Sequence, residues 1–186
     1  MTERRHGIVQ VYYGYGKGKT TAALGQAWRA MGRGLRVCFL QFLKPPGQSG
    51  EQLNAAVFGD RLFLAQYGRD RMAIAKQRGI EKWWQMPLDA DDRAAAEAGI
   101  ARARQAFREG CDVVVLDEFL DLAWLGLYTA EELLAIIQER PPAVELIVTG
   151  HELPDIIAAH AELITQTIPV KHPMEEGMGI RKGIDL

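Results

Sequence analysis

Apolar residues in this chain fall into six short runs separated by longer segments rich in helix formers. Four of the runs are almost continuously apolar, which is typical of strands buried on both faces of a parallel sheet. We expect strands at residues 8–13, 36–42, 61–67, 112–118, 145–149 and 163–168. Because strands and helices alternate, the pattern predicts an α/β fold with a doubly wound, six-stranded and largely parallel sheet.

Local signals support the helices between these runs. Asp89 is a predicted N-cap for a helix over residues 89–108. Thr129 and Glu132 form a capping box that begins another helix. A short helix is expected over residues 51–58 and another over 154–160. Residues 68–88 show no clear periodicity, so a mobile lid and a helical excursion packed by its tryptophans are both open interpretations.

A glycine-rich turn follows the first run, with Gly14, Gly16 and Gly18 just before a helical segment. Glycines let backbone N–H groups point at an anion, and the helix N-terminus adds further unpaired donors. Lys19 can reach phosphates and the Thr20 hydroxyl can bind magnesium. Only three residues separate Gly14 from Gly18, one fewer than in the common P-loop. The context nevertheless favours a nucleoside triphosphate site.

A pair of carboxylates, Asp117 and Glu118, ends the fourth apolar run. In P-loop proteins such a strand lies near the loop, so this pair is predicted to hold magnesium through hard oxygen ligands. Asp121 is expected to be a solvated surface residue. His151 and His172 follow predicted strands and should face the ligand edge of the sheet. We find no arrangement that indicates a side-chain nucleophile.

Composition narrows the function classes. The 186 residues fit one domain, 1–186, and the formal charge of -2 argues against a protein that binds nucleic acid through bulk charge. No stretch is long and apolar enough to predict a membrane span. Cys38 and Cys111 are expected to be buried free thiols in a reducing cytosol, so a cytoplasmic location is predicted.

Taken together, these motifs resemble the P-loop corrinoid adenosyltransferases. The resemblance runs from the first strand to the C-terminus and includes the shortened loop. It is carried by Gly14-Tyr-Gly-Lys-Gly-Lys-Thr-Thr21, Arg29-Ala-Met-Gly-Arg-Gly34, Gln41-Phe-Leu-Lys44, Val115-Leu-Asp-Glu118, Val148-Thr-Gly150, Val170-Lys-His-Pro173 and Gly183-Ile-Asp185.

The resemblance implies a RecA-like, three-layer P-loop NTPase fold and transfer of the 5′-deoxyadenosyl group of ATP to the cobalt of a reduced corrinoid, with release of triphosphate. It implies ATP as co-substrate, Mg²⁺ (or Mn²⁺), a homodimer and a flavoprotein reductant. By this similarity the catalytic residues are Lys19, Thr20 and Glu118, and the metal ligands are Thr20, Asp117 and Glu118. The implied ligand-binding residues are Gly14, Tyr15, Gly16, Lys17, Gly18, Lys19, Thr20, Thr21, Arg29, Gln41, Lys44 and His172.

The chain also departs from the family's pattern. His151 stands where an arginine is usual, and the Gly-Phe-x-Trp after the third strand is absent. Trp83 or Trp84 could replace those aromatics, or could simply pack a helix. An alternative function therefore stays open: an ATP-binding regulatory or corrinoid-carrier protein of the same fold without transferase activity. An ordinary ATPase or small-molecule kinase is a further reading, which the shortened loop disfavours.

Overall fold

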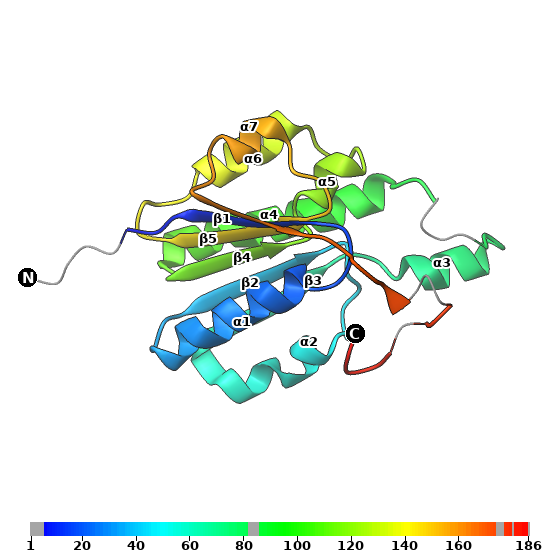
Figure 1. Ribbon diagram of the computed structural model, residues 1–186, viewed down its shortest axis with the longest axis horizontal. Helices are drawn as coiled ribbons and strands as arrows, with labels where there is room; N and C mark the ends of the chain where they lie inside the picture. Colours follow the sequence, from blue (N-terminus) through cyan, green and yellow to red (C-terminus); the bar gives the residue numbers. More distant parts are fainter. Residues whose placement is uncertain (1–5, 82–85, 174–176, 180, 186) are drawn as a thin grey trace, which may run out of the picture.

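A computed structural model describes residues 6–81, 86–173, 177–179 and 181–185. Its centre is a six-stranded, all-parallel sheet with strand order β3-β2-β4-β5-β1-β6 (Figure 1). The strands are β1 (Val9–Gly14), β2 (Val37–Phe42), β3 (Leu62–Tyr67), β4 (Val113–Asp117), β5 (Glu145–Gly150) and β6 (Leu163–Thr167). This confirms the predicted sheet, with strand boundaries shifted by a residue or two.

Helices lie on both faces of the sheet and complete a three-layer arrangement (Figure 1). They are α1 (Lys19–Gly32), α2 (Gly50–Asn54), α3 (Arg71–Gln77), α4 (Ala90–Glu109), α5 (Asp121–Trp124), α6 (Ala130–Gln138) and α7 (Asp155–Ala158). The predicted N-cap Asp89 begins α4, where it also forms a capping box with Asp92, and the predicted capping box of Thr129 and Glu132 begins α6. The single helix expected over residues 51–58 is instead α2 followed by a 3₁₀ helix, Ala55–Arg61, which bends at Gly59.

Alternate residues of the central strands enter two separate cores. In β2, Phe39 packs with α1, while Leu40 packs on the opposite face with α4. The same alternation in β4 and β5 explains why these strands form nearly continuous apolar runs in the sequence, since all their residues except the half-buried Glu145 are buried. Both cysteines are free thiols, as predicted, but only Cys38 is buried; Cys111 is half-buried.

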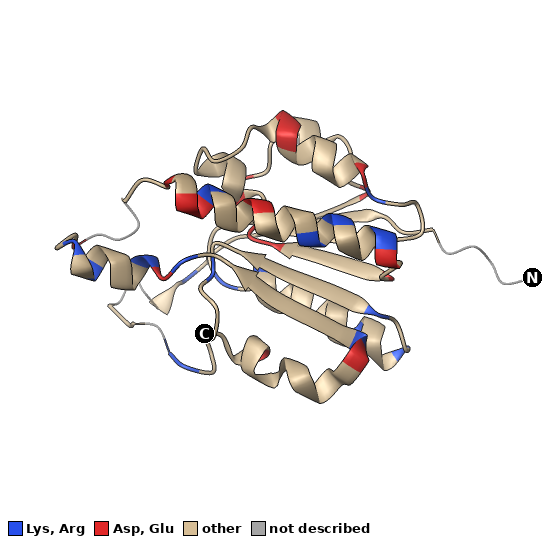
Figure 2. Cartoon of the chain, turned by 180° about the vertical axis from the view of Figure 1, so that it is seen from behind, with Lys and Arg blue, Asp and Glu red and all other residues tan. Residues whose placement is uncertain are grey.

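The edge strand β6 differs from the rest of the sheet because most of its residues are exposed. Leu163 and Ile164 remain 37% and 43% exposed, and no helix of the described residues covers that end of the sheet. Elsewhere the charged side chains gather on helices and connections, and the strands carry few of them (Figure 2). No helix within the described residues has the length and apolar character needed to cross a bilayer.

The segment expected to be a lid or a helical excursion contains α3, which extends beyond the carboxyl end of the sheet (Figure 1). Arg71 ties the start of α3 to Asp92 in α4 with an Nη1–Oδ2 distance of 2.8 Å, and it also donates to the carbonyl oxygen of Met86. Trp83 and Trp84 lie outside the described residues, so their predicted packing stays untested.

Candidate active site

The glycine-rich loop joins β1 to α1 at the carboxyl end of the sheet. Gly14 has a φ of 113°, which favours glycine, and a Cβ there would lie 2.2 Å from the carbonyl oxygen of Thr167. Gly18, with a φ of 129°, precedes the first residue of α1. The strand, loop and helix are thus arranged as predicted, and the N-terminal N–H groups of a 14-residue helix face the loop.

Lys19 folds back across this loop. Its ammonium group donates to the carbonyl oxygens of Gly14 at 2.6 Å and Gly16 at 3.1 Å, and the residue is 7% exposed. Burial lowers the pKa of Lys19, while the nearby carboxylates of Asp121 and Glu118 oppose that shift. The lysine therefore already spans the loop on which phosphates are expected to bind.

The carboxylate of Asp117 is fully buried and accepts hydrogen bonds from four side chains. Thr149 Oγ1 donates at 2.8 Å, Thr20 Oγ1 at 2.9 Å, Gln41 Nε2 at 3.0 Å and Lys44 Nζ at 2.7 Å. Burial alone would raise the pKa of Asp117, but the charge of Lys44 and these donors outweigh it and hold the pKa below its usual value. Asp117, at the end of β4, therefore joins α1, β2 and β5 through one charged group.

Glu118 turns away from Asp117 toward open space. Its φ of 60° is unusual for a residue with a side chain, and its N–H donates to Thr149 Oγ1 at 2.8 Å. Burial raises the pKa of the Glu118 carboxyl group to about 7, against the opposing charge of Lys44. The side chain is 27% exposed and lines the cavity above the loop. Its backbone turn thus directs a carboxylate at the predicted phosphate site.

Lys44 lies among the three predicted metal ligands. Its Nζ is 2.7 Å from Asp117 Oδ2, 3.3 Å from Thr20 Oγ1 and 3.5 Å from Glu118 Oε1. Burial would lower the pKa of Lys44, but the charges of Asp117 and Glu118 raise it, so the group stays an ammonium. Leu43, with a φ of 60°, turns the chain after β2 and delivers Lys44 to this position.

Asp121 is not the solvated surface residue that was expected. It is 2% exposed, and its Oδ1 accepts from the His151 N–H at 2.6 Å while its Oδ2 lies 2.9 Å from His151 Nδ1. The prediction was wrong because α5 begins three residues after Glu118 and its first residue packs against Gly150 at the end of β5. The backbone N–H of His151 and its ring thus both contact the same carboxylate, which holds the imidazole in this orientation. Its ring also lies 5.1 Å from that of Trp124 and 5.7 Å from that of Tyr15.

Two cavities meet above these residues. We call the first, of about 530 Å³, the loop pocket; it is lined by residues that include Lys17, Lys19, Thr20, Thr21, Lys44 and Glu118. The second, of about 870 Å³, is the tail pocket, lined by residues that include Ile168, Val170, His172, Pro173, Met178 and Arg181. Both pockets share Gly16, Lys17, Glu118, His151 and Asp185.

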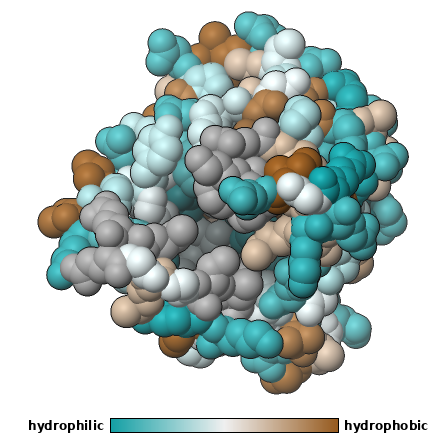
Figure 3. Space-filling view, turned by 90° about the vertical axis from the view of Figure 1, so that its right-hand side faces the viewer, coloured by the Kyte–Doolittle hydropathy of each residue, from teal (hydrophilic) through white to brown (hydrophobic). Residues whose placement is uncertain are grey.

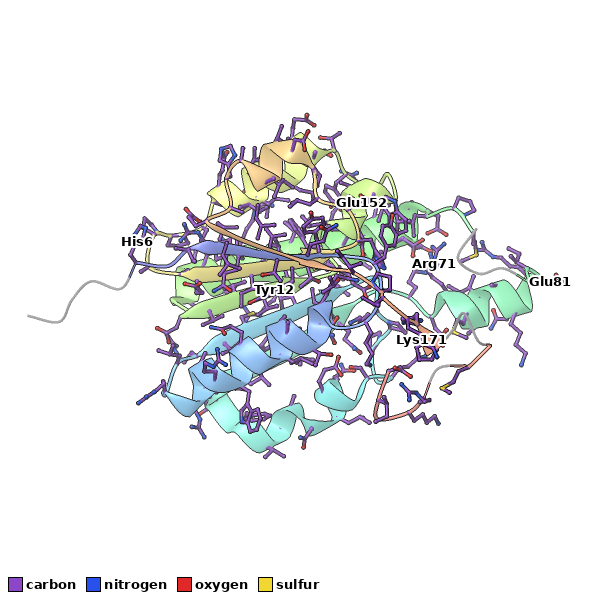
Figure 4. The ribbon with its side chains drawn as sticks, viewed as in Figure 1. His6, Tyr12, Arg71, Glu81, Glu152 and Lys171 are labelled. Atoms are coloured by element: carbon purple, nitrogen blue, oxygen red, sulfur yellow. The ribbon has the colours of Figure 1, made fainter. Side chains whose placement is uncertain are left out.

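The surface at the carboxyl end of the strands is hollowed near its middle (Figure 3). Arg71, Glu152 and Lys171 lie toward this end of the molecule, whereas His6 lies at the opposite end (Figure 4). The chain's last described residues reach the same end, where Lys17 Nζ donates to Asp185 Oδ1 at 3.0 Å and to the carbonyl oxygen of Ile184.

Five of the implied ligand-binding residues do not line the loop pocket: Gly14, Tyr15, Arg29, Gln41 and His172, of which His172 lines the tail pocket. Gln41 is fully buried and supports Asp117 from below. Tyr15 is 49% exposed and donates through its hydroxyl group to Glu152. Arg29 lies in the last turn of α1, ten residues beyond Lys19, and lines a different surface cavity with Tyr12. The structure therefore does not bring Arg29 to the loop of its own chain.

The fold and loop define a P-loop α/β protein with its ligand site at the carboxyl end of a parallel sheet. A solved structure with the same fold is the flagellar accessory protein FlaH from Methanocaldococcus jannaschii. The two match with a TM-score of 0.58 at 15% sequence identity, over 87% of this chain and 71% of FlaH. This likeness concerns the fold, and it agrees with the RecA-like arrangement expected from the sequence.

Residues 5–186 match the family model of the ATP:corrinoid adenosyltransferase BtuR/CobO/CobP, and the chain belongs to this family. The corrinoid adenosyltransferase of Escherichia coli is 32% identical over 100% of this chain and 88% of its own length. The corrinoid adenosyltransferase CobA of Salmonella typhimurium is 31% identical with the same coverage. A corrinoid adenosyltransferase of Pseudomonas aeruginosa is 29% identical over 96% of this chain. The resemblance noted from the motifs is confirmed.

Sequence reasoning missed two features of this site. The first is the Asp121–His151 pair, which joins residues 30 positions apart and places a histidine on the wall between the two pockets. The family usually has an arginine where this chain has His151, and that difference was the sequence signal that pointed to position 151. The second is Lys44, which was expected near ATP but not among the metal-ligating oxygens.

Proposed function

We propose that the loop pocket binds the triphosphate of ATP and that the adjoining tail pocket receives the corrinoid, so that the 5′ carbon of the ribose meets the cobalt between them. The observation that carries this proposal is the shared wall of the two cavities, formed by Gly16, Lys17, Glu118, His151 and Asp185. A wall common to both sites allows two substrates to be held in reacting contact, which converts an encounter into an oriented reaction.

The reaction requires no proton transfer to or from a side chain of the protein. The electron pair of cobalt(I) forms the new cobalt–carbon bond. The bond from C5′ to the phosphate oxygen breaks, and triphosphate leaves with the electron pair of that broken bond. No hydroxyl group or thiol has to be deprotonated, so the site needs no general base. The protein's contribution is orientation together with stabilisation of the charge that develops on the leaving group.

Charge stabilisation is assigned to the loop and to Lys19. The backbone N–H groups at the start of α1 face the place where phosphates bind. The ammonium group of Lys19 now contacts the carbonyl oxygens of Gly14 and Gly16, and we expect it to turn from them to the triphosphate. These groups lie in a partly closed pocket, where an electrostatic interaction is stronger than in bulk water.

Magnesium, or manganese in its place, fits the oxygens beside the loop. Among the described residues no group of three or more His, Cys, Asp and Glu side chains forms a metal site. Magnesium, however, is usually held by one or two carboxylates together with substrate phosphates. Thr20, Asp117 and Glu118 provide such a set, and the ammonium group of Lys44 among their oxygens acts as a stand-in cation. When bound, the metal would neutralise charge on the departing triphosphate.

Two partners belong to the same proposal. A second copy of the chain would cover apolar surface that includes Leu163 and Ile164 of β6. In sedimentation, Ile164→Glu should then shift the protein to monomers.

A flavoprotein reductant is proposed to supply the electron that converts cobalt(II) to cobalt(I), because the chain is expected to bring no redox cofactor of its own. The cytoplasmic location and the single domain over residues 1–186 remain predictions.

We also keep the proposal that residues 68–88 act as a lid over the corrinoid. In its support, α3 extends beyond the sheet and is anchored to α4 through Arg71. With chemically reduced cobalt(I), Trp83→Ala and Trp84→Ala should lose little activity. With cobalt(II) and a flavoprotein reductant, at least one should lose most of it. If both variants match the parent from either starting state, another group displaces the axial ligand.

The decisive experiment mixes the protein with ATP, magnesium and chemically reduced cobalamin and follows formation of a light-sensitive cobalt–carbon bond and of triphosphate. We expect both products from the parent and from Arg33→Ala, an exposed cation at the far end of α1. Lys19→Ala should yield neither. ATP binding without product would instead support a regulatory or carrier protein, and release of ADP would indicate an ordinary ATPase or kinase.

A further inference from the structure

The ammonium group of Lys44 is surrounded by the oxygens that would bind the metal. It lies 2.7 Å from Asp117 Oδ2, 3.3 Å from Thr20 Oγ1 and 3.5 Å from Glu118 Oε1. In this position a side-chain cation already balances the buried carboxylate of Asp117, which has no exposed surface.

We propose that the Lys44 ammonium group occupies the metal position of the nucleotide-free protein and moves to a phosphate oxygen when nucleotide binds, so that metal and nucleotide bind together. The inference rests on the proposed function only for the identity of the nucleotide and the metal. It concerns how the Lys44 ammonium group, the metal ion and the nucleotide replace one another in the site, and it requires no corrinoid.

The Lys44 ammonium group and the metal ion cannot occupy the same position at the same time, for steric and electrostatic reasons. Magnesium binds oxygen at about 2.0–2.1 Å, with near-octahedral geometry. A metal at that distance from Thr20, Asp117 and Glu118 would share the space now filled by the Lys44 ammonium group and would repel its charge. The lysine must therefore leave before the metal can use all three oxygens.

The side chain of Lys44 is able to leave. Its side chain is 20% exposed and lines the loop pocket, the same cavity as Lys19 and Thr21. A lysine has a flexible four-carbon stem and a compact charge, so rotation of the stem can carry the ammonium group into the pocket without moving the backbone. Phosphate oxygens entering the pocket would offer it a new partner with negative charge.

Two other lysines line the same pocket but are bound elsewhere. Lys17 contacts Asp185, and Lys19 contacts the carbonyl oxygens of Gly14 and Gly16. Within the described residues, the Lys17 ammonium group pairs with Asp185 and not with Asp117, so Lys17 provides a matched charge control. Replacing Lys17 removes one positive charge from the pocket without vacating the metal position.

The exchange has a thermodynamic consequence. If Lys44 opposes the metal and nucleotide withdraws Lys44, then each ligand strengthens binding of the other by the same factor. Free divalent metal should bind the empty protein weakly, even though two carboxylates and a hydroxyl group are in place.

Manganese binding without nucleotide tests the proposal directly, because free Mn²⁺ can be counted by electron paramagnetic resonance. Lys44→Met keeps the length of the side chain and removes its charge. It should bind Mn²⁺ more tightly than the parent by about 5–150-fold, the usual range for a coupling between two ligands. Lys17→Met should differ from the parent by less than about threefold, since exposed charges act weakly at a distance. Equal affinity of Lys44→Met and parent, or an equal gain in Lys17→Met, overturns the proposal.

A second measurement uses the unaltered protein and remains valid if Lys44→Met does not fold. In spectra of ¹³C-labelled lysine, the Lys44 Cε signal should shift when ATP is added without metal. Magnesium alone at the same concentration should leave it in place. If the Lys44 Cε signal does not shift with ATP, or shifts to the same extent with magnesium alone, the proposed movement of Lys44 is contradicted. Neither measurement contains a corrinoid, so failure of adenosyl transfer would not affect the outcome.

Discussion

Replacing Asp117 by asparagine should destabilise the protein out of proportion to the small chemical change. The substitution preserves shape but removes the charge that balances Lys44, whose Nζ lies 2.7 Å away. It also brings an NH₂ group to a position where Thr20, Gln41 and Thr149 all donate. An amide oxygen can accept from some of these donors, but the amide nitrogen faces others that need an acceptor.

The magnitude follows from burial. Asp117 has no exposed surface, and breaking a buried ion pair by removing one partner costs about 3–5 kcal/mol. Lys44 keeps 20% of its side chain in contact with solvent, which places the expected loss near the lower end, about 3 kcal/mol. For a chain of this length, each kcal/mol lowers the melting temperature by about 2–4 °C, so a fall of about 6–12 °C is expected.

Thermal and urea unfolding of the nucleotide-free protein, followed by circular dichroism, measure this loss. Lys44→Met should be destabilised as well, and the double variant should lose clearly less than the sum of the two single losses, because no uncompensated charge remains. A melting temperature of Asp117→Asn within about 2 °C of the parent would refute the reasoning. Losses that add to within about 0.5 kcal/mol would show that the two groups are not an energetic pair.

Three further results are expected. Lys19→Ala should keep the fold, because its lysine contacts only loop carbonyl oxygens, but calorimetry should detect no ATP binding. Glu118→Gln should need more magnesium for half-maximal activity. Asp121 was first expected to be a solvated surface residue, but because it is buried against His151, Asp121→Asn should lower activity at every magnesium concentration. Unchanged activity of Asp121→Asn would mean that the buried pair has no role. The hydrogen bond from Cys38 and the charge of Arg102 lower the pKa of Cys111 to about 7. The rate of alkylation of Cys111 should therefore rise with pH through about 7, while Cys38 stays unmodified. Mass spectrometry of digests would measure both.

Much of this architecture could be predicted because its signals are local. The apolar runs of β2 and β4 reflect burial on both faces, and the glycines at positions 14, 16 and 18 have the positive φ values for which glycine is suited. The N-cap at Asp89 and the capping box at Thr129 depend on residues no more than three positions apart. Each of these features is decided within a few neighbouring residues, so the sequence displays it directly.

The parts that escaped prediction depend on register between distant strands. Lys44 reaches Asp117 because β2 and β4 pair with Gln41 opposite Asp117, and because the left-handed turn at Leu43 redirects the chain. Asp121 is buried because α5 lies against Gly150, where a Cβ would be only 2.6 Å from Leu120 Cβ. No short sequence window contains both members of either pair.

The position of β1 in the sheet has a consequence for synthesis of the protein. Within the described residues, this first strand pairs only with β5 and β6, the two strands of the sheet that come last in the sequence. On the ribosome, β1 and the loop after it must wait for about 130 further residues, or roughly 7–25 s at usual rates of translation. During that interval an apolar strand with two unpaired edges is exposed to association with other chains. ATP can therefore stabilise the protein only after almost the whole chain has emerged.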